Sequence, residues 1–281
     1  MPSSLSSKIL SLYGKASCSL PSEVVSALKA SLKKESKPLA RRALDAILKS
    51  ASLSKGKFSP ICQDTGIPIF FVKYGRNFSQ LEIRSAIISA TKTATKKSLL
   101  RPNAVDSVSG KNSGNNIGEG FPVIYFEEKR GKGLEIQLLL KGGGCEYIGM
   151  QYSLPSEALK AERDLEGVRK CVLDAVFRAQ GKGCPPMVIG VGIAGARELA
   201  SFVSLKQLFR KLNDNSKNKK LAVLEKTLLK QINSLGIGPS GLGGKTTALA
   251  VKIGSAARHP ATFFVDISFC CWASRKASLK L

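Results

Sequence analysis

The sequence is poor in several residue types that mark particular protein classes. Its 281 residues include one histidine and one tryptophan, and aromatic residues make up 6% of the chain. No stretch reaches the roughly 20 consecutive apolar residues that a transmembrane helix requires, so we expect no membrane span. Residues 1–20 lack the continuous apolar core of a signal peptide. Because 43% of the residues are hydrophobic, a sizeable core is still possible, and we expect a cytoplasmic globular protein.

Acidic residues are scarce beside basic ones. Lys and Arg number 44 against 20 Asp and Glu, which gives a formal net charge of +24 at pH 7. Clustered Lys and Arg neutralise phosphates, so the charge alone raises the alternative of a nucleic-acid-binding protein. The basic residues are, however, spread from Lys8 to Lys280, and no aromatic residues interleave with them to stack bases. We therefore expect no nucleic-acid partner, and a positive field that attracts small anions.

Seven cysteines make an odd number, and we expect no disulfide framework. Three of them lie in separate glycine- or proline-rich turns: Cys62, Cys184 and Cys271. Their separations of 122 and 87 residues exclude a zinc knuckle or a ferredoxin-like run, whose ligands are closely spaced. Three distant thiolates that converge in the fold can hold an iron–sulfur cube and leave one iron open as a Lewis acid.

The other cysteines suit structural roles. Cys18 and Cys171 lie in apolar helical sequence, and Cys145 follows three glycines, where it either fills a turn or contributes to a site. Cys270 and Cys271 are neighbours in an extended segment, so their side chains should point to opposite faces. Only one of these two is expected to bind a metal.

Hydrophobic periodicity and turn residues predict a mixed α/β fold with layered sheets flanked by helices. Helices are expected within the first sixty residues with a break at Pro38, over 79–98 from a capping box, over 157–180 closed by a left-handed Gly181, and on both sides of a mobile linker at 213–220. Strands are expected at 66–72, 123–126, 134–140, 187–193, 246–253 and 261–267. We expect one module, with a helical part at 1–58 and a binding core at 59–275.

Two glycine-rich motifs resemble nucleotide-binding loops. Gly190–Gly195 has the GxGxxG spacing, but the acid that follows, Asp214, lies in a polar linker instead of at the end of a second strand. Gly244–Thr246 resembles the end of a phosphate-binding loop, although Pro239 stands where its first glycine belongs. We interpret the first as a tight strand–helix crossover and the second as a loop that presents amides and a lysine to a carboxylate.

Two polar residues near the cysteines suit acid–base or substrate-binding roles. Asp64 follows Cys62 by two residues, and its alternative role is to cap a turn with its own side chain. His259, the single histidine, lies in a loop twelve residues before Cys271, and its alternative role is that of an ordinary solvated residue. The carboxylate suits proton transfer, and the imidazole suits a hydrogen bond to a substrate carboxylate.

Seven sequence blocks occur in the order found in one enzyme family. They are Cys62–Gly66, Gly142–Glu146, Cys184–Pro186, Gly190–Ile193, Leu235–Pro239, Gly241–Thr247 and Cys271–Ala273. Over about residues 60–275 the chain resembles the α module of class I iron–sulfur fumarate hydratases and L-tartrate dehydratases. The resemblance implies the fold of the N-terminal domain of class I fumarases, and it accounts for both glycine motifs without a nucleotide.

The resemblance also implies a cofactor and a site. A [4Fe-4S] cluster would be held by Cys62, Cys184 and Cys271, and its open iron would take the substrate hydroxyl and a carboxylate. By the same resemblance, the residues around the substrate are Gln63, Asp64, Arg101, Gly144 and His259. Asp64 would be the catalytic group for proton transfer, while Arg101 and His259 would hold the two carboxylates.

The implied activity is that of a hydro-lyase that reversibly hydrates fumarate to malate, with L-tartrate dehydration as the alternative. Single-chain members of the family carry a second domain that this chain does not include. We therefore expect either a separate β subunit that completes the enzyme in an α₂β₂ heterotetramer or, alternatively, an orphaned half of the enzyme. In both cases we expect no activity from this chain alone. The expected partners are a small dicarboxylate and the β subunit, without a membrane.

Overall fold

The computed structural model describes residues 2–281, and its chain divides into two compact units. The first unit comprises the chain up to Pro21 together with Lys49–Gly143 and Ala273–Leu281, and the second comprises Ser22–Leu48 and Gly144–Trp272. The predicted N-terminal helices are present as α1 (Pro2–Cys18), α2 (Ser22–Lys34) and α3 (Pro38–Lys57). Pro38 opens α3, because the first helical position needs no backbone N–H donor.

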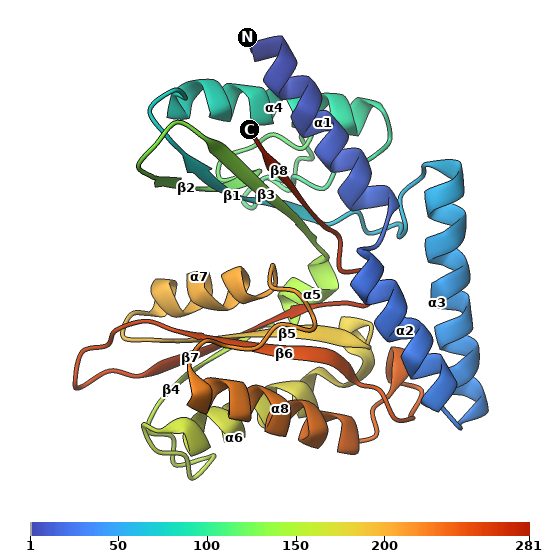
Figure 1. Ribbon diagram of the computed structural model, residues 1–281, viewed down its shortest axis with the longest axis vertical. Coiled ribbons are helices and arrows are strands. Elements are labelled where there is room, and N and C mark those ends of the chain that lie inside the picture. The colour runs from blue at the N-terminus through green and yellow to red at the C-terminus, as the bar shows by residue number, and fades with distance from the viewer. Residues whose placement is uncertain (1) are drawn as a thin grey trace. The chain divides into compact units, whose positions relative to one another are not determined.

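The first unit is built on a four-stranded sheet in the order β2-β1-β3-β8. Its strands are β1 (Ile67–Tyr74), β2 (Val123–Glu128), β3 (Leu134–Lys141) and β8 (Lys276–Lys280). β1 pairs in parallel with β2, and β3 pairs antiparallel with both β1 and β8. The helices α1 and α4 (Gln80–Lys96) lie together against this sheet (Figure 1). Tyr13, Phe70, Ile83 and Leu138 are among the fully buried side chains between these layers.

The start of α4 is set by local sequence, as predicted. Ser79 accepts a hydrogen bond from the N–H of Leu81 (3.2 Å), and the Glu82 carboxylate accepts one from the N–H of Ser79 (3.3 Å). This capping box satisfies N–H groups that the first turn of a helix leaves free. The polar stretch after α4 contains no long helix or strand and leads to β2.

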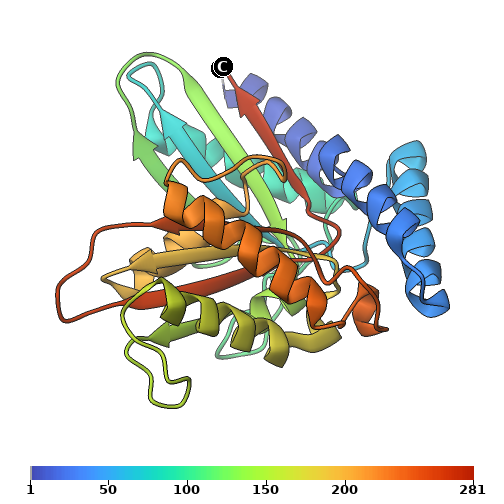
Figure 2. The same cartoon turned by 60° about the horizontal axis from the view of Figure 1, so that its bottom comes forward.

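The second unit is a sheet between helices, in the order β4-β7-β5-β6. Its strands are β4 (Met150–Ser153), β5 (Met187–Ala194), β6 (Ala248–Ser255) and β7 (Phe264–Cys270). β5 and β6 are parallel, and β7 is antiparallel to β5 and β4. One face carries α7 (Arg197–Gln207), and the other carries α6 (Leu165–Ala179) and α8 (Lys219–Ser234) (Figures 1 and 2). Both faces of β5 are therefore buried.

Two predictions about α6 are wrong. The helix begins at Leu165 and not near residue 157, because the Asp164 side chain caps it by accepting the N–H of Gly167 at 2.7 Å. The left-handed residue after the helix is Gln180 (φ 47°), which begins the short 3₁₀ helix η1 (Gln180–Gly183). Gly181 serves packing instead: a Cβ atom there would lie 2.9 Å from the Cα of Gly241.

The linker before α8 is held in place, contrary to the expectation of a mobile segment. The Lys252 side chain is 3% exposed, and its Nζ donates to the carbonyl oxygens of Leu212 (3.0 Å) and Asp214 (2.6 Å) and to Oδ1 of Asp214 (3.0 Å). Arg210 binds the same Asp214 carboxylate and also Glu225 on α8. A buried ammonium group therefore fixes the polar linker to β6.

Candidate functional site

In the first unit, the segment Cys62–Gly66 leads into β1 and holds the Asp64 carboxylate in a fixed position. Oδ1 of Asp64 accepts the N–H of Gly66 (2.9 Å), and Oδ2 accepts the N–H of Gly143 (2.9 Å). The first bond is the turn-capping role weighed above as the alternative for Asp64. The second bond ties the carboxylate to the end of β3. Both oxygens keep a lone pair for a further partner.

Arg101 is attached to the same segment through its backbone. Its N–H donates to the hydroxyl of buried Thr65 at 2.9 Å, and its carbonyl accepts from the side chain of Asn116 at 2.8 Å. The side chains of Arg101 and Gln63 are exposed. The first unit therefore brings together four of the predicted residues: Cys62, Gln63, Asp64 and Arg101.

In the second unit, Cys184 and Cys271 lie in adjacent turns. Cys184 follows η1 in a left-handed conformation (φ 52°, ψ 63°), which residues other than glycine adopt rarely and at a cost in free energy. Its carbonyl oxygen accepts the N–H of Trp272 at 3.3 Å. The segment after β7 is thereby held against the turn before β5.

Solvent exposure separates the seven cysteines into two groups. Cys184 is exposed, and Cys62 and Cys271 are partly exposed. The remaining four are buried at 3% exposure or less: Cys18, Cys145, Cys171 and Cys270. None of the seven forms a disulfide within residues 2–281. The three cysteines in the glycine- and proline-rich turns are thus the three that solvent reaches, and they are divided between the units, with Cys62 in the first.

Cys145 lies in the short helix α5 (Gly143–Tyr147), directly after Gly144. A hydrogen bond with the thiol of Cys271, together with burial, raises the pKa of the Cys145 thiol. Cys145 also lies 3.7 Å from the carbonyl oxygen of Gly183. It is therefore a protonated neighbour of the Cys271 and Cys184 turns. Among residues 2–281, no group of three or more His, Cys, Asp or Glu side chains is close enough to hold a metal ion.

His259 lies at the other end of the same sheet. Gly195, after the carboxyl end of β5, packs against its loop, since a Cβ atom at Gly195 would be 2.8 Å from the His259 backbone nitrogen. Cys184 precedes β5 at its amino end, and Cys271 follows the antiparallel β7 at that same end. A seven-residue strand spans about 23 Å. The second unit therefore does not bring His259 to the cysteine turns, and its role toward the same substrate stays a prediction that this geometry does not favour.

The imidazole of His259 has a defined hydrogen-bonding state. Its Nδ1 accepts the N–H of Ala261 at 3.1 Å, and the side chain is exposed.

The two nucleotide-like motifs have structural explanations. Cβ atoms at Gly190 and Gly192 would lie 2.3 Å from the carbonyl oxygen of Ser204 and 2.0 Å from that of Ala200, so these glycines let α7 approach β5 closely. In the other motif, the N–H of Lys245 donates to the buried Glu35 carboxylate at 2.7 Å. The loop does present an amide to a carboxylate, and that carboxylate belongs to the chain itself.

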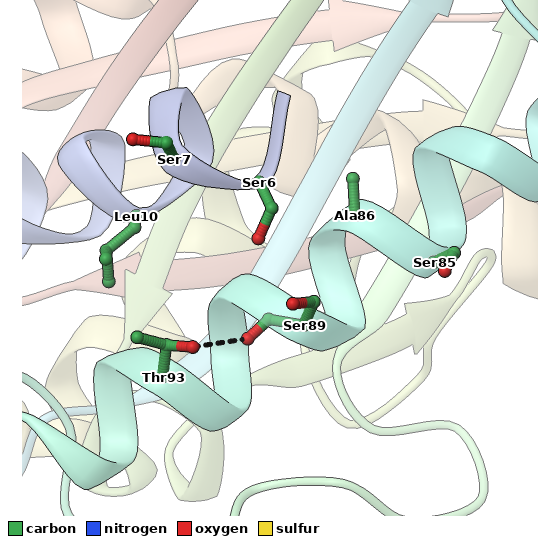
Figure 3. A pocket seen from close by; sticks show the side chains of 7 residues that line it. All are labelled: Ser6, Ser7, Leu10, Ser85, Ala86, Ser89 and Thr93. Carbon is green, nitrogen blue, oxygen red and sulfur yellow. Dashed lines mark hydrogen bonds between the residues drawn. The ribbon is translucent and has the colours of Figure 1, made fainter. Parts of the chain in front are cut away.

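A separate pocket of about 410 Å³ lies between α1 and α4 in the first unit (Figure 3). Hydroxyl and small apolar side chains line it: Ser6, Ser7, Leu10, Ser85, Ala86, Ser89 and Thr93. The Thr93 hydroxyl donates to the carbonyl oxygen of Ser89 at 3.0 Å and so is engaged within its own helix. The pocket lining contains no ionisable side chain, and we assign it no chemistry.

Sequence comparison gives the family of this chain. Residues 6–280 match the family model described as "Fumarate hydratase (Fumerase)". The chain belongs to the fumarate hydratase family. It is 44% identical over 269 residues to a Geobacillus stearothermophilus protein provisionally named fumarate hydratase class I, which covers 94% of this chain and 52% of that protein. The chain thus spans about half the length of that relative.

Other relatives of this fumarate hydratase family chain are named as subunits of a different enzyme. A Methanocaldococcus jannaschii protein, provisionally named L(+)-tartrate dehydratase subunit alpha, is 38% identical over 278 residues, or 97% of this chain and 96% of that one. The L(+)-tartrate dehydratase subunit alpha of Escherichia coli K12 is 40% identical over 222 residues, or 78% of this chain and 72% of that one. Both names occur within the family, so family membership leaves the two substrates open.

Sequence analysis missed two residues that hold the site segments. Glu35 anchors the Gly244–Lys245 loop, and Arg275 is buried beside Asp64. Neither belongs to a glycine-rich block, and each acts on a residue about 210 positions away in the chain. A glutamate or arginine at a position that becomes buried gives no local signal when the partner is so distant. No helix in residues 2–281 has the length and apolar character of a membrane span, in agreement with the sequence.

Proposed function

We propose that this chain is the α subunit of a [4Fe-4S] hydro-lyase that reversibly hydrates fumarate to malate. Membership of the fumarate hydratase family supports the reaction class. The observation that supports an iron–sulfur cofactor is that Cys62, Cys184 and Cys271 are accessible to solvent, whereas the other four cysteines are buried. A cytoplasmic location stays a prediction.

The donor set fits such a cluster. Thiolates are the usual ligands of iron–sulfur clusters, and three of them leave one iron of a cube for substrate. Within the second unit, the turns of Cys184 and Cys271 lie together, because the N–H of Trp272 donates to the carbonyl oxygen of Cys184. We therefore assign Cys62, Cys184 and Cys271 as the ligands.

The residues of this chain bind and orient the substrate. The exposed Arg101 guanidinium suits one carboxylate of a dianion through paired charge-assisted hydrogen bonds. The Gln63 amide and the backbone of Gly144 are the further binding groups in the proposal. Because Thr65 fixes the Arg101 backbone next to Asp64, the bound carbon chain would lie beside the Asp64 carboxylate.

Asp64 is the proposed group for proton transfer. Two backbone N–H donors hold its carboxylate, so its orientation is set before substrate arrives. Dehydration of malate removes a proton from the carbon next to a carboxylate and a hydroxide from the neighbouring carbon, so that the net products are fumarate and water. When bound, the cluster supplies Lewis-acid polarisation of that hydroxyl. Asp64 would accept the carbon-bound proton and return it in the reverse direction.

A separate β subunit completes the enzyme in this proposal. The chain spans 52% of the Geobacillus relative but 96% of the Methanocaldococcus relative, whose name contains "subunit alpha". The "subunit alpha" name of that relative supports a second chain as partner, and an α₂β₂ assembly is the proposed form. The missing groups would include the partner of the second substrate carboxylate.

L-tartrate dehydration is the second candidate. Two relatives that this chain covers over most of their length, 96% and 72%, are named L(+)-tartrate dehydratase subunit alpha, and these names favour the second candidate. Tartrate and malate share two carboxylates and one hydroxyl, and tartrate adds a second hydroxyl. The residues above recognise only the shared groups, so the β subunit would make the distinction.

The test is anaerobic purification of the tagged chain, with whatever binds it, from its own cells. The purified complex is assayed with malate and with L-tartrate, and a complex with Cys62→Ser serves as the matched control. Turnover of one acid that Cys62→Ser abolishes would support the proposal and identify the substrate. An iron-containing complex that is inactive on both acids, or activity that survives Cys62→Ser, would contradict it.

A further inference from the structure

Arg275 is a buried cation with few partners. It is 2% exposed and directly precedes β8, and its carbonyl oxygen accepts the N–H of Leu140 at 2.9 Å. Its Nη1 donates to the backbone carbonyl of Asp64. Its Nε has no hydrogen-bond partner within residues 2–281. Within residues 2–281, the carbonyl oxygen of Asp64 is thus the hydrogen-bond acceptor of a guanidinium that has five N–H groups.

This arrangement is unfavourable for folding alone. Removing a charged group from water has a large free-energy cost unless a counter-charge and hydrogen bonds offset it. Lys252 in the second unit shows the ordinary solution, since its buried ammonium has three acceptors, one of them a carboxylate. A buried polar group without a partner needs an explanation, and a ligand that enters later is one.

The surroundings of Arg275 place it at the candidate site. A Cβ atom at Gly142 would lie 3.3 Å from Nη2 of Arg275 and 2.9 Å from Oδ2 of Asp64, so the guanidinium and the carboxylate flank the same glycine. The Asp64 carboxylate is engaged by the N–H groups of Gly66 and Gly143 and forms no ion pair with Arg275 among the described residues. Within residues 2–281, the positive charge beside Cys62–Gly66 thus has no ion pair with the carboxylate nearest to it, and its Nε has no hydrogen-bond partner.

We infer that Arg275 is a positioning residue of the Cys62–Gly66 segment and that its remaining N–H donors meet an anion that enters the site. Its bond to the Asp64 carbonyl fixes the segment that carries a proposed cluster ligand and the proposed proton-transfer group. The inference rests on the proposed function. Two anions are available there, the thiolate-bound cluster and a substrate carboxylate, and both suit a guanidinium.

The experiment compares wild type with Arg275→Met, Arg275→Lys and the control Lys252→Met. Two quantities are measured under anaerobic conditions. The first is the thermal midpoint of the cluster-free chain. The second is the rate at which a chelator removes iron from the reconstituted chain, with and without L-malate. The control removes a buried cation whose acceptors are all supplied by the protein.

Arg275→Met should unfold at the wild-type temperature or above it, because an apolar side chain of similar length replaces an unpaired buried ion. The chelator should remove its iron at least about tenfold faster than from the wild type, which is the usual effect of losing a residue that supports a metal ligand. Arg275→Lys, which keeps the charge without the planar fork, should lie in between. Lys252→Met should lower the thermal midpoint and release iron at the wild-type rate.

Each other outcome has a defined meaning. Arg275→Met could instead lose iron at the wild-type rate without malate but no longer be protected by malate. That result would identify the anion as a substrate carboxylate, and the inference would stand. If Arg275→Met lost iron at the wild-type rate and malate slowed that loss as it does in the wild type, this result would overturn the inference. So would a fall in thermal midpoint as large as that of Lys252→Met, which would show a structural role. A wild-type chain that takes up no iron would overturn the proposed function, and the inference with it.

Discussion

The backbone N–H of Lys245 donates a hydrogen bond of 2.7 Å to Oε2 of Glu35, a residue 210 positions earlier in the chain. Oε1 of the same carboxylate accepts the N–H groups of Ser36 (2.9 Å) and Lys37 (3.0 Å). Burial raises the pKa of Glu35, but these hydrogen bonds outweigh it and hold the pKa below its usual range. An internal carboxylate thus takes the place that a bound anion has in a phosphate-binding loop.

Glu35→Gln should therefore destabilise the second unit by about 2 kcal/mol at neutral pH. The amide of glutamine cannot accept on both sides, so one of the backbone N–H groups would face an NH₂ group. Because the folded pKa of Glu35 is lowered, its contribution is complete above the unfolded pKa and is lost as the pH falls through the folded pKa. Urea unfolding at several pH values should show the two proteins converging in acid. A difference that is constant with pH would contradict this account of Glu35.

Gly142→Ala should impair catalysis more than folding. The new Cβ atom would lie 2.9 Å from Oδ2 of Asp64, so the carboxylate would shift and weaken its hydrogen bond with the N–H of Gly143, at a cost of about 1 kcal/mol. A displaced proton-transfer group lowers the rate by about 100-fold. The rate of malate turnover and the unfolding midpoint are measured in the purified complex. Gly56→Ala is the matched control, because nothing lies within 4 Å of its added Cβ atom.

Native-state alkylation should follow the exposure of the cysteines. Iodoacetamide applied to the cluster-free chain at mildly alkaline pH should modify Cys184 first and then Cys62 and Cys271. Burial raises the pKa of Cys171 to about 12, and it also raises the pKa of Cys18. These thiols should react at about one tenth of the rate of the exposed cysteines or more slowly still, because the thiolate is the reactive form. Mass spectrometry of the modified peptides checks the order, and early labelling of Cys171 would contradict it.

Lys252→Met should lower the free energy of unfolding by about 2 kcal/mol, because the carbonyl oxygens of Leu212 and Asp214 lose their buried donor. Arg210 still pairs with the Asp214 carboxylate, so the loss is smaller than for a fully broken buried pair. Urea unfolding measures the change. If the variant were as stable as the wild type, the linker would not be held by Lys252.

The elements that the sequence predicts well are those with local signals. The capping box at Ser79 and the buried apolar runs of β1 and β3 are each specified by a few neighbouring residues. The elements that were missed are short: α5, β4 and β8 have four or five residues each. The start of α6 was misplaced because Asp164 caps the helix, which therefore begins at Leu165 and not near residue 157.

The candidate site divides in the same way. The glycine- and proline-rich blocks indicated the turns that carry Cys62, Cys184 and Cys271, because the residues within a turn largely determine its conformation. The distance of His259 from the cysteine turns depends on the antiparallel pairing of β7 with β5, which local sequence does not reveal. The hydrogen bond between Arg275 and Asp64 likewise depends on tertiary packing, because an arginine is normally exposed to solvent.

The most direct test of the central claim is the iron and sulfide content of the anaerobically reconstituted chain. The wild type should hold about four irons per chain. Cys62→Ser, Cys184→Ser and Cys271→Ser should each lose most of that iron, while the matched controls Cys171→Ser and Cys270→Ser should retain it. A wild type without iron, or a Cys270→Ser variant that loses iron while Cys271→Ser keeps it, would contradict the account.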